Sequence, residues 1–227
     1  MKYTGRISFI SIVLAFSFIQ ILFLGESIPR EIVGGLIASI IALFIGWQYD
    51  KMNFYANHDH LTELFNRRFA LKRFTKLKAK SARIHSSLAV FILDVNNFKE
   101  LNDRFGHKTG DYTLKKLAML LLDHTQKSDI VARWGGDEFV IISLGCTHEK
   151  AEHLIDRLEE EILEHIHQAK IPLKIGVSIG YALYPEEGNS LDELLHVADQ
   201  KMYKVKIQRK HTSGQQKRLS LHIRKPE

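Results

Sequence analysis

Two long uncharged stretches dominate the hydrophobic pattern near the N-terminal end of the chain. Residues 7–24 (ISFISIVLAFSFIQILFL) and residues 32–49 contain no charged side chain. As a helix, each would rise roughly 27 Å at about 1.5 Å per residue, close to the hydrocarbon thickness of a bilayer. We therefore expect residues 1–50 to form a two-helix transmembrane hairpin with spans at these stretches. A signal peptide is the alternative for the first stretch, but the apolar run is long and no A-x-A-like site precedes Gly25.

The charges that flank these stretches predict their orientation. Lys2 and Arg6 precede the first stretch and Lys51 follows the second, whereas the connecting GESIPRE carries two acids and one arginine. The positive-inside rule then places both ends of the hairpin in the cytoplasm. We expect a multi-pass protein of the inner, cytoplasmic membrane whose spans contact lipid and whose remaining residues are cytoplasmic. Eight more basic residues without an acid lie at 67–83, and they either touch anionic lipid headgroups or form a solvated helix face.

Beyond residue 50 the pattern changes to shorter helical and strand-like segments. Residues 51–80 contain neither proline nor glycine, so we expect a connecting helix that continues out of the membrane. Strand-like runs at 130–134 and 139–143 flank a Gly-Gly-Asp-Glu turn, which predicts a β-hairpin. A continuous apolar run predicts a buried strand at 87–95, and alternation predicts a strand at 174–184. Helical spacing predicts helices at 114–124, 151–168 and 191–208. Helices mixed with hairpin strands indicate an α+β domain with an antiparallel sheet.

Composition narrows the class of protein. The 227 residues, 45% hydrophobic and 26% charged, suit one folded domain with a modest extension. The single cysteine, Cys146, excludes a disulfide scaffold and a cysteine-built zinc site, and we expect a reduced, buried thiol. The net charge of +6 resides in residues 205–227, because the rest of the chain is balanced. This segment lacks Phe, Tyr and Trp, so we expect a solvated or lipid-touching basic tail at 212–227 and no nucleic-acid partner.

Candidate chemistry lies at the end of the first predicted strand of the domain and in the hairpin turn. Asp94 closes that strand, and Asp137 and Glu138 occupy the turn. If the strands are neighbours, three carboxylates meet at one edge, and their hard oxygens suit Mg²⁺ or Mn²⁺. Gly135 and Gly136 would let a nucleotide approach the turn closely. This arrangement suggests phosphoryl transfer, although two glycines and two acids also occur in ordinary hairpin turns.

Four ordered blocks of sequence resemble the GGDEF family of diguanylate cyclases. They are DHLTELFNRR at 59–68, DVNNFKELNDRFGH at 94–107 with TGD at 109–111, ARWGGDEF at 132–139, and ADQKMYKVK at 198–206. The resemblance implies a catalytic GGDEF domain at 81–211 with the central, mostly antiparallel sheet of nucleotidyl cyclases and polymerase palms. It also implies that a homodimer condenses two GTP molecules into cyclic di-GMP and two pyrophosphates, each subunit presenting one GTP across a two-fold axis.

The resemblance assigns metal-binding and catalytic roles residue by residue. Asp94, the backbone carbonyl of Val95 and Asp137 would hold Mg²⁺ or Mn²⁺. Asp137 or Glu138 would accept the proton of the 3′-hydroxyl, and the sequence does not decide between them. Lys99 would stabilise the transition state, because a fixed cation near the phosphates offsets developing charge.

The resemblance also assigns the substrate site. Asn102 and Asp111 would select guanine, since a carboxylate accepts hydrogen bonds from both guanine N1–H and the exocyclic amine. Lys206 matches a phosphate-binding lysine. The remaining substrate-binding positions would be His107, Gly135, Gly136 and Lys210.

The sequence departs from the family pattern at four places. The product-binding R-x-x-D reads QKSD at 126–129, so the arginine fork is missing and we expect weak or absent product inhibition. Asn96 stands where Asp is usual, which removes a negative charge beside a second metal. Lys210 stands where Arg is expected and lacks its bidentate geometry, although Arg209 would substitute after a register shift. Glu63 replaces the usual glycine of D-x-L-T-G-L, which puts the local turn in question.

These departures leave an alternative function open. The chain would then be a catalytically weak GTP-binding or partner-binding signalling module at the membrane. The acids Asp137 and Glu138 argue against it, because degenerate members of the family usually lose the acids of the turn. The sequence therefore favours the cyclase.

Overall fold

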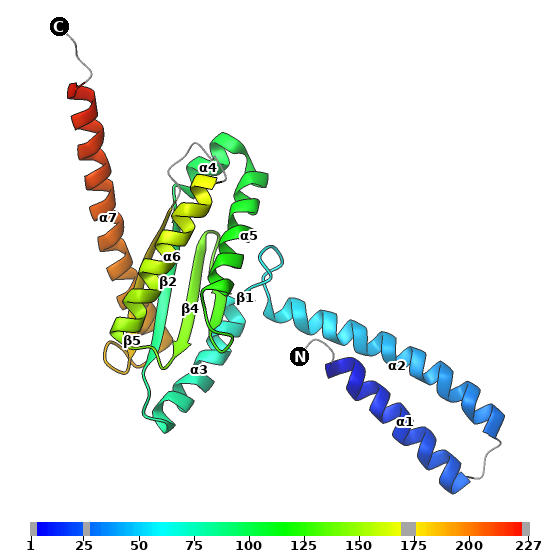
Figure 1. Cartoon of the computed structure of the whole chain (residues 1–227). Helices are drawn as coiled ribbons and strands as arrows, with labels where there is room; N and C mark the ends of the chain where they lie inside the picture. Colours follow the sequence, from blue (N-terminus) through cyan, green and yellow to red (C-terminus); the bar gives the residue numbers. More distant parts are fainter. Residues whose placement is uncertain (1–3, 25–27, 169–175, 224–227) are drawn as a thin grey trace. The chain divides into compact units, whose positions relative to one another are not determined.

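The computed structural model describes residues 4–24, 28–168 and 176–223, and Figure 1 shows their helices and strands. The chain divides into two compact units, Met1–Asn57 and His58–Glu227. Each unit has its own packing, and each is described by itself below.

The first unit is a pair of antiparallel helices, α1 (Thr4–Leu24) and α2 (Ile28–Asn57). Their contact is close where Gly46 faces the start of α1, since a Cβ on Gly46 would lie 2.7 Å from the Arg6 Cα. The Asp50 carboxylate accepts a hydrogen bond from the Gly5 N–H over 2.8 Å and pairs with the Arg6 side chain. Asp50 thus satisfies an N–H of the first turn of α1, which has no partner within its own helix.

Hydropathy distinguishes the two helices. Among the described residues, one helical stretch, Val33–Asn57, is long and apolar enough to cross a membrane. Thr4–Gln20 is apolar but shorter than such a span. The expected hairpin of helices is therefore present, while its membrane crossing by two spans stays a prediction.

The single connecting helix expected at 51–80 is wrong, because the chain turns between α2 and α3 (Arg67–Arg83). The Asp59 carboxylate accepts hydrogen bonds from the backbone N–H groups of Leu61 and Thr62, and Glu63 adopts a left-handed φ of 58°. Asn66 then caps α3 by accepting from the Phe69 N–H. Side chains that bond to the nearby backbone compete with a helix, which a search for proline and glycine cannot reveal.

The second unit is built on a five-stranded sheet in the order β1-β3-β4-β2-β5. All neighbouring pairs are antiparallel except β1 with β3, so the expected mostly antiparallel sheet is confirmed. The predicted hairpin is confirmed as β3 and β4. The strands are β1 (Phe65–Asn66), β2 (Leu88–Asn96), β3 (Ile130–Arg133), β4 (Glu138–Leu144) and β5 (Gly176–Tyr184).

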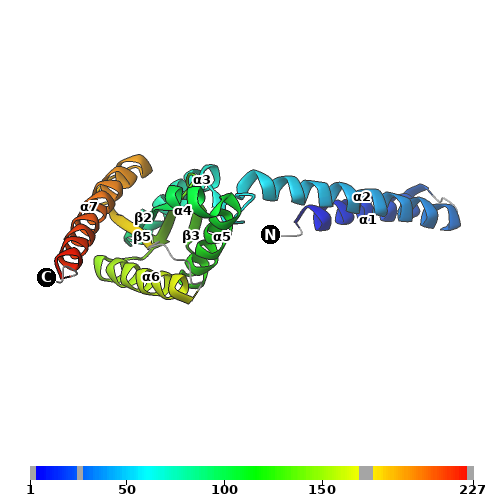
Figure 2. The same ribbon diagram turned by 90° about the horizontal axis from the view of Figure 1, so that it is seen from above.

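Helices cover both faces of this sheet, because alternate strand residues point to opposite sides. The helices α4 (Phe98–Phe105), α5 (His107–Asp123) and α6 (His148–Gln168) pack with β2 residues such as Phe91 and Leu93. The opposite face packs on α3 and on α7 (Leu191–Ile223), through β2 residues such as Val90 and Ile92. Figure 2 shows α6 and α7 on the two sides of the sheet.

The other predicted elements correspond to observed ones with shifted ends. The helix expected at 114–124 is the second half of α5, and the helix expected at 191–208 is the first part of α7. The strand expected at 174–184 begins at Gly176, and its first two residues lie outside the described part of the chain. Cys146 is a free, buried cysteine, as expected.

Candidate active site

Three acidic residues meet at one edge of the sheet, because the strand order brings the β3–β4 turn beside the end of β2. Asp94 lies directly opposite Glu138 in the register of β2 and β4. The Val95 N–H donates to the Asp137 carbonyl over 3.2 Å and so ties the turn to β2. The expected proximity of Asp94, Asp137 and Glu138 is therefore observed.

The charges at this edge act strongly on one another. Burial raises the pKa of the Asp137 carboxyl, and the Asp94 carboxylate raises it further. The pKa of Glu138 is raised in the same way, first by burial and then by Asp94 and Asp137. Lys206, reaching in from α7, forms an ion pair with Asp94. Because neighbouring like charges oppose ionisation, the edge favours a bound cation.

The donor set at this edge matches a hard divalent cation in kind. The carboxylates of Asp94 and Asp137 and the Val95 carbonyl offer the oxygen ligands that Mg²⁺ and Mn²⁺ prefer. Among the described residues, no three Asp, Glu, His or Cys side chains converge as a ready-made metal centre. Lys206 instead supplies the positive charge on Asp94. The match is thus one of donor chemistry and charge, not of preformed ligand geometry.

Arg133 organises the turn itself. Its guanidinium donates to the Gly135 carbonyl over 3.2 Å and to the Gly136 carbonyl over 2.7 and 3.1 Å. Its Nη1 also donates to the Asp59 carboxylate over 3.0 Å. Arg133 therefore joins the turn to the segment before β1. Asp59 and Arg133 lie in two separate blocks that resemble the GGDEF family, but nothing in the sequence indicates that they pair.

Asp59 is held in its ionised form by these contacts. Burial alone would raise its pKa, but hydrogen bonds from Thr62 and Arg133, together with the Arg133 charge, lower the pKa below its ordinary value of 3.8. The Asp59 and Arg133 side chains are only 17% and 14% exposed. Such a pair is partly shielded from solvent, so it contributes more than an exposed surface pair would.

The two glycines of the turn have different surroundings. A Cβ on Gly135 would lie 2.8 Å from the Glu138 Oε2. The position favours glycine because the Glu138 carboxylate occupies the space that a side chain would need. A Cβ on Gly136 would meet no atom within 4 Å. Gly136 therefore borders open space in which a ligand can approach the turn.

The predicted guanine-selecting residues lie on the adjacent helices α4 and α5. Asn102 on α4 faces Gly110 on α5, where a Cβ would lie 2.0 Å from the Asn102 Oδ1. That Oδ1 is buried and accepts no hydrogen bond from the described residues. Asp111 is exposed and follows Gly110 directly. A buried amide oxygen without a donor is costly, so this position favours a ligand that supplies one.

The remaining predicted site residues have no described contact with the carboxylate edge. Lys99 on α4 and His107 at the start of α5 are exposed, and among the described residues no contact joins them to the carboxylate edge. Lys210 falls in α7, but its side chain lies outside the described part of the structure. Asn96, one of the departures, accepts a hydrogen bond from the buried Ser178 hydroxyl over 3.0 Å.

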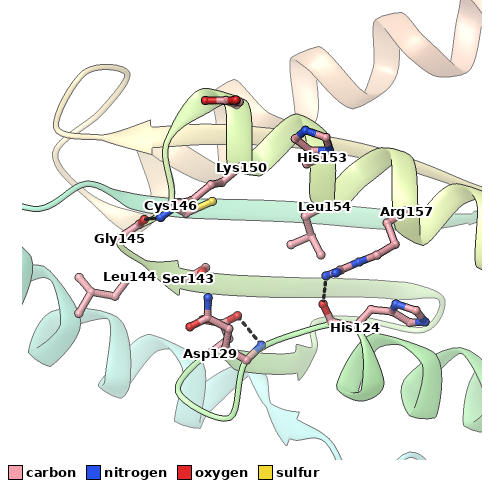
Figure 3. A pocket seen from close by; sticks show the side chains of 12 residues that line it. His124, Asp129, Ser143, Leu144, Gly145, Cys146, Lys150, His153, Leu154 and Arg157 are labelled. Carbon is pink, nitrogen blue, oxygen red and sulfur yellow. Dashed lines mark hydrogen bonds between the residues drawn. The ribbon is translucent and has the colours of Figure 1, made fainter.

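The QKSD stretch borders a pocket at the opposite end of the β3–β4 hairpin from the glycine turn (Figure 3). The cavity measures about 500 Å³. One oxygen of the Asp129 carboxylate, Oδ2, accepts the Gln126 N–H over 2.9 Å, and burial raises the pKa of Asp129. Two cationic side chains of the lining already donate to backbone carbonyls: Arg157 to the His124 carbonyl over 2.5 Å, and Lys150 to the Gly145 carbonyl over 3.2 Å.

The sequence is similar to those of known proteins. The family model described as "Diguanylate cyclase, GGDEF domain" matches residues 56–212. The diguanylate cyclase TpbB of Pseudomonas aeruginosa is 40% identical over 159 residues, which cover 67% of this chain and 36% of that protein. The diguanylate cyclase DosC of Escherichia coli is 38% identical over 152 residues, covering 65% and 32%. The chain thus spans about a third of the length of these curated relatives.

Solved structures agree in fold. The GGDEF domain of the Pseudomonas protein TpbB or YfiN has a TM-score of 0.57 at 39% identity, covering 66% of this chain and 89% of the other. A sensory box/GGDEF family protein from Caulobacter crescentus has a TM-score of 0.59 at 33% identity, covering 67% and 99%. With the family model matching more than half of its residues, this chain belongs to the GGDEF family.

Proposed function

We propose that the chain is a diguanylate cyclase that condenses two GTP molecules into cyclic di-GMP and two pyrophosphates. One observation carries the proposal: the intact Gly-Gly-Asp-Glu turn lies beside Asp94 on the neighbouring strand, in a chain of the GGDEF family. Relatives named as diguanylate cyclases match this same part of the chain.

The carboxylate edge would hold the metal. Asp94, the Val95 carbonyl and Asp137 are the proposed ligands for Mg²⁺ or Mn²⁺, and Lys206 would leave Asp94 for a substrate phosphate. When bound, such a metal lowers the pKa of a hydroxyl and neutralises charge on phosphate oxygens. Asp137 or Glu138 would accept the proton of the 3′-hydroxyl.

The substrate would lie between this edge and the helices α4 and α5. Asn102 is proposed to bind guanine, supported by its buried Oδ1 that lacks a donor among the described residues. Asp111 would accept from the guanine N1–H and amine. Gly136 would leave room for the nucleotide, while Gly135 leaves room for the Glu138 carboxylate beside it. Lys99 would offset charge in the transition state. The proposed phosphate-binding or further substrate contacts are His107, Lys206 and Lys210.

Each half of the reaction is an in-line displacement. The 3′-oxygen of one GTP forms a bond to the α-phosphorus of the other, the bond to pyrophosphate breaks, and the 3′-proton passes to the acid of the turn. Two such steps close the ring and release two pyrophosphates. One chain presents one GTP, so we propose a homodimer in which the two turns face each other.

Assay of the purified full chain with GTP and Mg²⁺ tests this function, with product and pyrophosphate resolved by chromatography. We expect cyclic di-GMP from the wild type and a loss of at least about a thousandfold in Asp137→Ala, since a ligand and a candidate base are removed together. Lys115→Ala, at an exposed position of α5, is the matched control and should retain activity. A dimer that binds GTP without releasing pyrophosphate would instead establish the GTP-binding module.

The cyclase is proposed to lack product inhibition at the QKSD stretch. Gln126 cannot grip phosphate or guanine as an arginine fork does. The pocket beside it supports this, because Arg157 and Lys150 already donate to backbone carbonyls.

Membrane anchoring is proposed through α2, with α1 as a second span and the catalytic unit in the cytoplasm. The helical stretch Val33–Asn57, which is long and apolar enough to cross a membrane, supports the anchor. The contact of Asp50 with Gly5 and Arg6 brings the charged ends of both helices to the same end of the pair. Basic residues at that end satisfy the positive-inside rule.

A further inference from the structure

Helix α3 has an extreme charge composition that the catalytic site does not use. Its 17 residues include eight Lys or Arg and no acid. Exposed helices of globular proteins usually mix the two signs, which stabilises them through pairs three or four residues apart. Here like charges recur at this spacing, so they repel one another unless an external anion neutralises them.

The basic side chains are sorted by face. Ala70, Phe74 and Ser81 are buried against the sheet and define the inner face of α3. At 100° per residue the opposite side carries Arg68, Lys72, Lys76 and Arg83, with Lys80 at its margin. All five of these side chains are exposed. We name this set the outer basic face: Arg68, Lys72, Lys76, Lys80 and Arg83.

The other cations of α3 are engaged in the fold. Arg67 stacks over the Trp134 ring at 4.7 Å, and Arg73 lies over the Phe69 ring at 5.9 Å. Lys78 donates to the Asn189 carbonyl. On the outer basic face, by contrast, Lys72, Lys76, Lys80 and Arg83 form no ion pair with the described residues.

Chain connectivity limits the distance between this face and the proposed membrane anchor. The helix that contains the candidate span ends at Asn57, and α3 begins at Arg67. The intervening residues span at most roughly 35 Å even when fully extended. Attraction to an anionic leaflet acts within about 8 Å at physiological salt, so a short tether greatly raises the chance of contact.

The chemistry of the face favours lipid over nucleic acid. Binding of single-stranded nucleic acid relies on aromatic side chains interleaved with cations, and the outer basic face contains none. Leu71 at the flank of the face is 40% exposed, which suits an interfacial helix. We propose that the outer basic face of α3 docks on anionic phospholipid headgroups, an inference that rests on the proposed membrane anchoring.

The test uses the full chain in nanodiscs of phosphatidylcholine, with or without phosphatidylglycerol. An environment-sensitive fluorophore is attached at Ala79→Cys, an exposed position in the middle of this face. Cys146, the other cysteine, is buried with its pKa raised to about 11, so it reacts slowly. We expect quenching by brominated lipid to be at least about threefold stronger in anionic discs and to fall at high salt.

Two matched variants separate docking from general electrostatics. The triple variant Lys72→Gln, Lys76→Gln, Lys80→Gln should lose the difference between the discs. Lys115→Gln with Lys116→Gln, at exposed positions of α5, should retain it. Equal quenching in both discs would overturn the proposal, as would a signal that appears only with added DNA. Chain recovered outside the discs would overturn the anchoring proposal and this one together.

Discussion

Arg133 and Asp59 show how a single pair of side chains organises the catalytic turn from outside it. The Arg133 guanidinium donates hydrogen bonds to the carbonyls of Gly135 and Gly136, and the Asp59 carboxylate holds the guanidinium in place. The Asp59 carboxylate also accepts hydrogen bonds from the N–H groups of Leu61 and Thr62. The segment that follows α2 and the turn that carries the acids are thus coupled through one ion pair.

This pair predicts a pH dependence of stability. Because the folded chain lowers the pKa of Asp59 below 3.8, the unfolded chain takes up the proton at higher pH. The stability that ionised Asp59 contributes is therefore fully present well above the ordinary pKa of 3.8. It begins to fall at roughly pH 5 and is lost as the pH passes below the lowered pKa of the folded chain.

Urea unfolding of the wild type and Asp59→Asn measures this contribution. At neutral pH the variant should be less stable by about 2 kcal/mol, since an ionic hydrogen-bond acceptor is lost. The difference between the two proteins should shrink as the pH falls. Asp103→Asn, at an exposed position, is the control and should show neither effect. A difference independent of pH would contradict the assignment.

A second prediction at the residue scale concerns product inhibition. The initial rate of the wild type should be insensitive to added cyclic di-GMP, because residue 126 is Gln. Gln126→Arg should restore inhibition by at least about tenfold in the inhibition constant, since a bidentate cation is gained. Gln126→Lys, which adds charge without the fork, is the control. An uninhibited Arg variant would show that the occupied Arg157 also prevents binding.

At the scale of elements, α7 reaches the active-site edge because it packs directly on the backbone of β5. A Cβ on Gly180 would lie 2.1 Å from the Ala198 carbonyl and 2.6 Å from the Met202 nitrogen. This close approach continues along the helix to Lys206, which meets Asp94. The position of a phosphate-binding candidate therefore depends on one glycine in a strand.

Gly180→Ala should accordingly destabilise the catalytic unit by about 3 kcal/mol, because α7 has to move away from β5. Thermal unfolding monitored by circular dichroism gives the change. Gly176→Ala in the same strand meets only the Asn96 side chain at 3.8 Å, so it should change stability little. Equal effects of the two substitutions would indicate a loss of strand flexibility rather than helix displacement.

At the scale of the whole molecule, the chain consists of two compact units, Met1–Asn57 and His58–Glu227. The sheet and its helices provide a hydrophobic core on both faces within residues 58–227. The sequence suggested a boundary near 81, because the continuous helical pattern concealed the turn at Asp59. The helix α3 therefore belongs to the catalytic unit and supplies part of its core.

The two units predict the behaviour of a truncated chain. Residues 58–227 should fold cooperatively and remain in the soluble fraction, whereas the full chain should sediment with membranes. Fractionation and thermal unfolding test this outcome. A third chain that starts at residue 84 lacks α3. It should aggregate, because the removal of Ala70 and Phe74 exposes the apolar side chains that they cover. A stable protein starting at 84 would restore the boundary expected from the sequence.

Much of this protein was accessible from its sequence because the signals are local. Apolar runs identified β2 and the hairpin of β3 and β4, and adjacent acids in the turn identified the carboxylate edge. Tertiary structure alone decided what joins distant residues. Asp59 meets Arg133, Lys206 meets Asp94, and Asn102 faces Gly110, because packing brings their elements together. Hydrophobic periodicity records which face of an element is buried, but not which element covers it.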